Sequence, residues 1–64
     1  MNHQTLAGRR LYFVGIGGSG MSAYANAARA LGADTRGWDA HETIFTNTLQ
    51  GIEIDLGGDP RPPD

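Results

Sequence analysis

The sequence predicts an α/β fold in which three short parallel strands alternate with two helices, in the order β-α-β-α-β. Three observations predict it. Four consecutive apolar residues, 11–14, are followed at once by a glycine-rich turn. A helical pattern of apolar residues begins directly after that turn, and strand-like segments follow at residues 35–38 and 52–56. Short strands joined by such segments imply a parallel sheet with right-handed crossovers.

The first strand and the first helix have the clearest signals. Residues 11–14, Leu-Tyr-Phe-Val, are typical of a strand that is buried on both faces. The helix is expected from Ser19 to Leu31, with Gly32 as its left-handed cap. Its apolar side is expected to face the sheet. The expected inward positions are Met21, Tyr24, Ala25, Ala28 and Leu31, and the expected outward positions are Ser22, Asn26 and Arg29.

The second half of the chain has weaker patterns. Residues 35–38 predict a second strand that ends at Asp39. Residues 42–50 are expected to form a second helix that stops at Gly51, although they include three threonines, which are poor helix formers. Residues 52–56 alternate between apolar and acidic side chains, as a half-exposed strand does.

Length, composition and charge exclude several classes of function. A chain of 64 residues forms at most one small domain, and it has no cysteine for a disulfide or thiolate site. A formal charge of −2 provides no basic surface for nucleic acid or a membrane. No apolar run approaches the roughly 20 residues of a membrane span. Residues 1–5 have neither the basic nor the apolar region of a signal peptide, so a cytoplasmic location is expected. His3 and His41 lack metal-ligand spacing, so no metal site is expected.

Residues 15–20 match the pattern G-x-G-x-x-G, and the segments on either side of them support the match. The motif follows a strand, opens a helix, and has Asp39 at the end of the next strand, as a Rossmann-like dinucleotide loop requires. Gly15 would permit the tight turn, Gly17 would leave room for a pyrophosphate, and Gly20 would let the helix pack against the strand. Phosphates would bind backbone N–H groups at the helix N-terminus, because no arginine is placed to help and the chain has no lysine.

Several candidate residues have a plainer alternative role. Asp39 could accept hydrogen bonds from ribose hydroxyls, and its charge would disfavour NADP; alternatively it is a surface turn residue. Trp38 and His41 could stack on a base, but a partly buried indole and a solvated histidine are favoured. Met21 could contact a ligand, but a position in the core is favoured. The loop itself could be a glycine turn without a ligand.

The string of residues 13–22, Phe-Val-Gly-Ile-Gly-Gly-Ser-Gly-Met-Ser, resembles the motif after the first strand of the N-terminal, UDP-binding domain of the Mur ligase family. It is most similar to the members that join L-alanine to UDP-N-acetylmuramate. Weaker similarities extend the resemblance over about residues 9–60, namely at residues 31–33, 37–39, 49–54 and 56–59. The chain departs from the family at Trp38, where serine is common, and at Gly58, where histidine is common.

The resemblance implies binding of the diphosphate of a UDP-sugar, UDP-N-acetylmuramate, in a ligase of peptidoglycan and cell-wall synthesis. The implied binding residues are Gly15, Ile16, Gly17, Gly18, Ser19, Gly20, Met21, Ser22 and Asp39. The family forms an amide with ATP and Mg²⁺, using a P-loop lysine in a separate domain. The chain has no P-loop and no lysine, so neither a catalytic residue nor a cofactor nor turnover is expected here.

Two other functions remain open. The chain could be an NAD- or FAD-binding fragment of an oxidoreductase, or a non-catalytic nucleotide-binding module. Gly18 and the pair Met21-Ser22 favour the UDP-sugar over the first of these.

The expected organisation is a flexible leader (1–8), a nucleotide-binding unit (9–59) that is a truncated half of a doubly wound domain, and a proline-rich tail (60–64). Strand one is internal in a complete domain, so its uncharged edge is expected to be exposed and to promote self-association.

Overall fold

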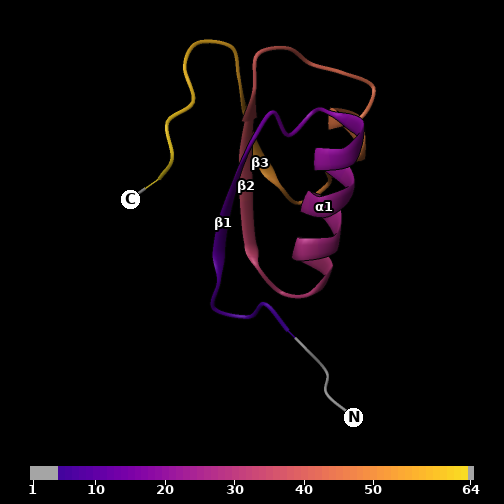
Figure 1. Cartoon of the computed structure of the whole chain (residues 1–64), viewed down its shortest axis with the longest axis vertical. Coiled ribbons are helices and arrows are strands. Elements are labelled where there is room, and N and C mark those ends of the chain that lie inside the picture. The colour runs from indigo at the N-terminus through magenta and orange to yellow at the C-terminus, as the bar shows by residue number, and fades with distance from the viewer. Residues whose placement is uncertain (1–4, 64) are drawn as a thin grey trace.

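A computed structural model describes residues 5–63 and shows a three-stranded parallel sheet with one helix on one face (Figure 1). The elements are β1 (Arg10–Val14), α1 (Ser19–Ala30), β2 (Asp34–Asp39), the 3-10 helix η1 (Thr46–Thr48) and β3 (Glu53–Leu56). The predicted α/β class and parallel sheet are confirmed. Part of the predicted leader, His3 and the last residue of the predicted tail lie outside the described residues.

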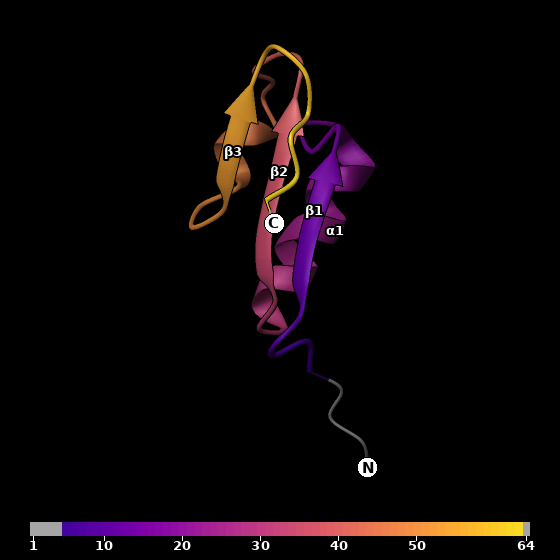
Figure 2. The same cartoon turned by 90° about the vertical axis from the view of Figure 1, so that its left-hand side faces the viewer.

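The strands lie in the order β1-β2-β3, so β2 is central and β1 and β3 are the two outer strands (Figure 2). Both pairs are parallel: Tyr12 is opposite Arg36, and Trp38 is opposite Asp55. The carboxyl ends of all three strands therefore meet at one edge of the sheet. This arrangement brings the glycine-rich loop after β1 close to Asp39 at the end of β2.

The helix begins and ends close to the predicted residues. Gly32 has a φ of +100°, as the predicted left-handed cap requires. The N–H of Gly32 donates to the carbonyl of Arg29, and the N–H of Ala33 donates to the carbonyl of Ala28. Together these two bonds form a Schellman motif, which satisfies carbonyl groups that the helix end would leave unpaired.

The predicted buried face of α1 is wrong in part. The buried positions are Ser22, Ala25 and Ala28. Three of the large residues expected to face inward are instead exposed, to 39% for Met21, 70% for Tyr24 and 47% for Leu31. The reason is steric: small side chains let the helix approach the strands closely, whereas large ones would hold it away from the sheet.

The predicted helix over residues 42–50 is also wrong, because this segment contains only the 3-10 turn η1. Threonine hydroxyls bond to the local backbone instead. Thr46 Oγ1 donates to the carbonyl of Thr43 and Thr48 Oγ1 donates to that of Phe45, both at 2.7 Å. The N–H of Phe45 donates to Thr43 Oγ1 at 3.0 Å. Side-chain bonds of this kind compete with helical hydrogen bonds.

The core lies between α1 and the sheet and is small. Its buried residues are Ile16, Ala25, Leu49 and Ile52, with Phe13 and Ile54 packed against them. Ile16 is completely buried. The helix α1 has 12 residues, and no helix in residues 5–63 is long and apolar enough to cross a membrane.

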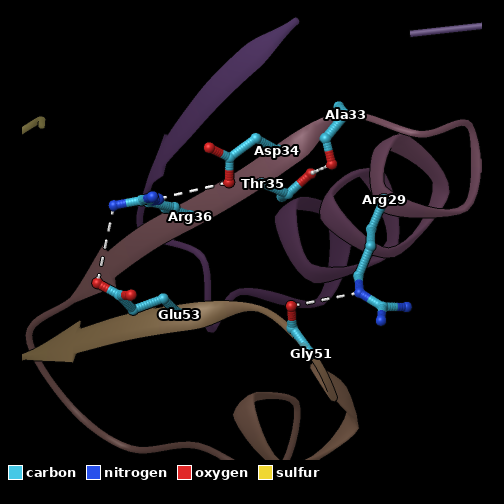
Figure 3. Close-up of polar contacts among 7 residues, drawn as sticks. All are labelled: Arg29, Ala33, Asp34, Thr35, Arg36, Gly51 and Glu53. Atoms are coloured by element: carbon cyan, nitrogen blue, oxygen red, sulfur yellow. Dashed lines mark hydrogen bonds and ion pairs between the residues drawn. The ribbon is translucent and has the colours of Figure 1, made fainter. Parts of the chain in front are cut away.

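The opposite face of the sheet carries polar side chains and part of the C-terminal tail. Arg36 lies between Asp34, at 3.4 Å, and Glu53, at 3.9 Å, on the neighbouring strand (Figure 3). The tail passes over this face, and the N–H of Arg61 donates to the hydroxyl of Tyr12 at 3.0 Å (Figure 2). The guanidinium of Arg36 is thus engaged on the sheet, away from the glycine-rich loop, as its predicted position inside the strand implies.

Candidate functional site

The glycine-rich loop turns sharply at the end of β1 and is attached to the end of β2. Gly15 has a φ of +81°, a conformation that glycine adopts without strain. The N–H groups of Gly15 and Ile16 both donate to the carbonyl of Trp38, at 2.7 and 3.0 Å. The predicted role of Gly15 in a tight turn is therefore confirmed. The buried side chain of Ile16 then anchors the loop in the core.

Asp39 bonds directly to the loop. Its Oδ2 accepts a hydrogen bond from the N–H of Gly17 at 2.8 Å, and its Oδ1 accepts one from the N–H of His41 at 3.1 Å. The hydrogen bond from the His41 backbone, followed by that from Gly17, lowers the pKa of the Asp39 carboxyl. The group is therefore ionised at neutral pH, so Asp39 places a negative charge against the loop from within the protein.

Gly17 is required by the packing of the protein itself. A Cβ at this position would lie 2.9 Å from Asp39 Oδ2, 3.0 Å from Thr46 Cγ2 and 3.1 Å from Thr43 Oγ1. The hydroxyl of Thr43 also donates to the carbonyl of Gly17 at 2.7 Å. The space expected to admit a pyrophosphate at Gly17 is thus occupied by protein side chains, because the segment after β2 folds over the loop.

Gly18 and Gly20 behave differently, since the fold does not require either to be glycine. Gly18 has an ordinary φ of −72°, and the atom nearest to an added Cβ is the Gly15 carbonyl oxygen at 3.4 Å. A Cβ at Gly20 would meet nothing within 4 Å, and the residue is exposed. The predicted role of Gly20 in packing the helix against the strand is therefore wrong. Glycine inside a helix costs about 1 kcal/mol relative to alanine.

Both glycines lie at the N-terminus of α1, which has no side-chain cap and no acidic residue in its first turn. The N–H of Ser22 is bonded to the carbonyl of Gly18. The N–H groups of Ser19, Gly20 and Met21 precede this first helical bond and have no acceptor within the helix. The helix dipole favours an anion at this point.

The other predicted loop residues divide into supporting and accessible ones. Ser22 is 3% exposed, and its hydroxyl donates to the carbonyl of Ser19 at 3.0 Å. Ser22 and the buried Ile16 therefore hold the loop in place with side chains that face away from solvent. Met21 is exposed beside the helix N-terminus, so the core position that was favoured for it is wrong.

The aromatic residues beside Asp39 lie at the rim of this edge. The indole N–H of Trp38 donates to the carbonyl of Gly57 at 2.8 Å, which holds the partly buried ring against the end of β3. His41 is exposed. Within residues 5–63, no three His, Cys, Asp or Glu side chains come together to hold a metal ion.

Sequence reasoning did not identify the role of Thr43 and Thr46, which pack against Gly17. In the sequence these threonines are evident only as poor helix formers. Their position a few residues after Asp39 is the one signal in the sequence that could have placed them near the loop. The segment that follows β2 must pass the carboxyl ends of the strands.

The chain is similar to known proteins over most of its length. Residues 10–61 match the family described as "Mur ligase family, catalytic domain". Among its relatives, the UDP-N-acetylmuramate–L-alanine ligase of Francisella philomiragia is 38% identical over 52 residues, or 81% of this chain. Those of Porphyromonas gingivalis and Sorangium cellulosum are 42% identical over 80% and 43% identical over 77% of it.

The aligned regions make up only 12%, 12% and 11% of these three relatives. No solved structure gives a significant match. The family match covers most of the chain, and it includes the glycine-rich loop, Asp39 and all three strands. The chain therefore belongs to the Mur ligase family.

Proposed function

We propose that the chain binds the diphosphate of a UDP-sugar, UDP-N-acetylmuramate, at the N-terminus of α1. The observation that carries the proposal is the pair Gly18 and Gly20, which the fold does not need and which leave the helix N-terminus uncovered. Family membership and the substrate after which the relatives are named supply the ligand class. A ligand phosphate that approaches the backbone closely accounts for both glycines.

The geometry suggests which groups would contact the ligand. The N–H groups of Ser19, Gly20 and Met21 are available to a phosphate, whereas that of Gly17 already donates to Asp39. Each carboxylate oxygen of Asp39 accepts one backbone hydrogen bond and retains capacity for another. We therefore assign one phosphate to the helix N-terminus and a ribose hydroxyl to Asp39.

We propose that these 64 residues form the substrate-binding half of a ligase site and that they catalyse no turnover by themselves. Amide formation with ATP and Mg²⁺ would need a phosphate-binding lysine, and the sequence contains none. We also propose a cytoplasmic location, in keeping with the Mur ligase relatives of the chain. ADP release by the purified chain, supplied with ATP, L-alanine and UDP-N-acetylmuramate, would contradict this assignment.

Binding can be separated from folding with two matched helix variants. Gly20→Val adds bulk at the helix N-terminus, where a Cβ meets nothing, and Ala23→Val adds comparable bulk at an exposed position one turn later. We expect UDP-N-acetylmuramate to bind Gly20→Val about tenfold more weakly than the parent or worse, a loss of about 1.4 kcal/mol. Ala23→Val should bind as the parent does. Calorimetry gives the affinities, and amide chemical shifts of residues 19–21 locate the ligand.

A second candidate ligand is NAD, because an acidic residue at the end of β2 is also the ribose contact of dinucleotide sites. Parallel titrations with NAD, UDP-N-acetylmuramate and inorganic pyrophosphate discriminate between the candidates. Tighter binding of NAD would assign the site to the dinucleotide. Equal weakening by both valine variants, or no shift at residues 19–21, would remove the helix N-terminus from the site.

A further inference from the structure

We propose that Thr43 is a positioning residue of the UDP-sugar site. Its hydroxyl holds the peptide group between Gly17 and Gly18, and this keeps the first turn of α1 open to a phosphate. The proposal deepens the proposed function and rests on it. The contacts that carry it connect the loop after β1 with the segment after β2.

The hydroxyl of Thr43 uses all of its hydrogen-bonding capacity. Its oxygen accepts from the N–H of Phe45 at 3.0 Å and from the N–H of Thr46 at 3.3 Å. A hydroxyl has two acceptor positions and one hydrogen, so the hydrogen remains for the carbonyl of Gly17, at 2.7 Å. The turn that follows Thr43 therefore sets the direction of the bond to the loop.

The position requires a hydroxyl, because one atom must accept twice and donate once. A carboxylate oxygen would accept from the two N–H groups, but it has no hydrogen for the Gly17 carbonyl, and valine can do neither. Thr46 orients Thr43 in turn: its hydroxyl accepts from the N–H of Thr43 at 3.1 Å and donates to the carbonyl of Thr43 at 2.7 Å. The segment after β2 thus presents one oriented hydroxyl to the loop.

The peptide group between Gly17 and Gly18 is bonded at both of its ends. Its carbonyl accepts from Thr43, and its N–H, which belongs to Gly18, donates to the carbonyl of Gly15 at 3.0 Å. The preceding peptide group is held too, because the N–H of Gly17 donates to Asp39 at 2.8 Å. Two consecutive peptide planes are therefore fixed beside glycines, which by themselves would leave the backbone free to rotate.

The fixed carbonyl decides where α1 begins. In a helix that started earlier, the carbonyl of Gly17 would accept from the N–H of Met21, four residues later. Here Gly18 is extended, with a φ of −72° and a ψ of 153°, and the Gly17 carbonyl is bonded to Thr43 instead. The first helical bond therefore runs from the N–H of Ser22 to the carbonyl of Gly18. The N–H of Met21 is thus kept available for the phosphate.

Burial separates the supporting residues from those assigned to the ligand. Gly17 is buried and Thr43 is partly buried, whereas residues 18–20 are exposed. We therefore assign Thr43 an effect that passes through the loop, and no contact with the phosphate. Backbone groups that are already in place before the ligand arrives lose less conformational freedom on binding, which raises the affinity.

Calorimetric titration of the full chain with UDP-N-acetylmuramate tests the proposal with three variants. Thr43→Val removes the hydroxyl and keeps the shape of the side chain, and Thr43→Ser restores the hydroxyl. Thr48→Val is the matched control, because the hydroxyl of Thr48 also donates to a backbone carbonyl at 2.7 Å, that of Phe45 and not one in the loop. We expect Thr43→Val to bind about tenfold more weakly than the parent, and the other two variants to bind within about twofold of it.

Amide exchange without ligand distinguishes positioning of the loop from a general loss of stability. The amide of Gly18 should exchange faster in Thr43→Val, relative to amides in the middle of α1, but not in Thr43→Ser or Thr48→Val. Circular dichroism should show that all three variants are folded.

The outcomes separate this proposal from the proposed function. Parental affinity or parental Gly18 exchange in Thr43→Val, no recovery in Thr43→Ser, equal weakening by Thr48→Val, or an unfolded Thr43→Val chain would each overturn the positioning role and leave the UDP-sugar site standing. A parent chain that does not bind UDP-N-acetylmuramate would instead refute the proposed function, and the role of Thr43 with it.

Discussion

Gly37 in the centre of β2 allows the glycine-rich loop to lie against the sheet, and its replacement by alanine tests this packing. A Cβ at Gly37 would lie 2.8 Å from Ile16 Cβ and 2.8 Å from the Phe13 carbonyl oxygen. The second atom belongs to the backbone of β1, and Ile16 is completely buried. Neither group can move aside unless the sheet or the loop is displaced.

The expected loss of stability follows from these two contacts. Overpacking of a core costs about 1–3 kcal/mol, and expulsion of an isoleucine side chain costs about 1.5–3 kcal/mol. We therefore expect Gly37→Ala to lower the free energy of unfolding by about 3 kcal/mol. A domain of this size has roughly 3–10 kcal/mol in total, so the variant should be marginally folded at best.

Urea denaturation followed by far-UV circular dichroism measures this loss. Gly20→Ala is the matched control, because its added Cβ meets nothing within 4 Å. The control should be at least as stable as the parent, since alanine favours a helix by about 1 kcal/mol over glycine. A Gly37→Ala chain with parental stability and a still-buried Ile16 would refute the packing argument.

Three further predictions follow from local contacts. Gly32→Ala places a side chain at a φ of +100° and should cost roughly 1–2 kcal/mol; an unchanged melting temperature would contradict this. The lowered pKa of Asp39 contributes stability above the ordinary carboxyl value of 3.8, and this contribution is lost as the pH falls through the folded pKa. Asp39→Asn should therefore flatten the acid limb of stability against pH, and an unaltered limb would argue against the contribution. Trp38→Phe removes the bond to the Gly57 carbonyl and should cost about 0.5–1.5 kcal/mol, measured by circular dichroism because the chain has one tryptophan.

The elements that sequence predicted correctly depend on residues close together in the chain. The start of α1 follows from the glycine-rich turn before it, and its end follows from Gly32. The proximity of Asp39 to the loop was also predictable, since parallel strands bring their carboxyl ends to one edge of the sheet. The prediction of a second helix was wrong because the threonine hydroxyls of residues 43–48 form hydrogen bonds with the local backbone in place of a helix. The apolar pattern of the segment does not reveal these bonds.

The errors in the site arose where distant segments approach. Apolar periodicity indicated Met21, Tyr24 and Leu31 as the inner face of α1. The helix instead lies so close to the sheet that small residues form its buried face. The hydrophobicity of the residues alone does not specify how closely the helix approaches the sheet. Likewise, the G-x-G-x-x-G pattern did not show that Gly17 packs against the protein while Gly18 and Gly20 remain open.

The sequence by itself determined the α/β class, the three parallel strands, the position of the glycine-rich loop and its acidic neighbour. Turn residues, caps and short-range periodicity encode these features locally. Only the tertiary structure decided which face of α1 is buried, and that Asp39 and Thr43 hold Gly17. Those contacts join residues 22 and 26 positions apart, so they depend on the path of the intervening chain and on how closely two surfaces meet.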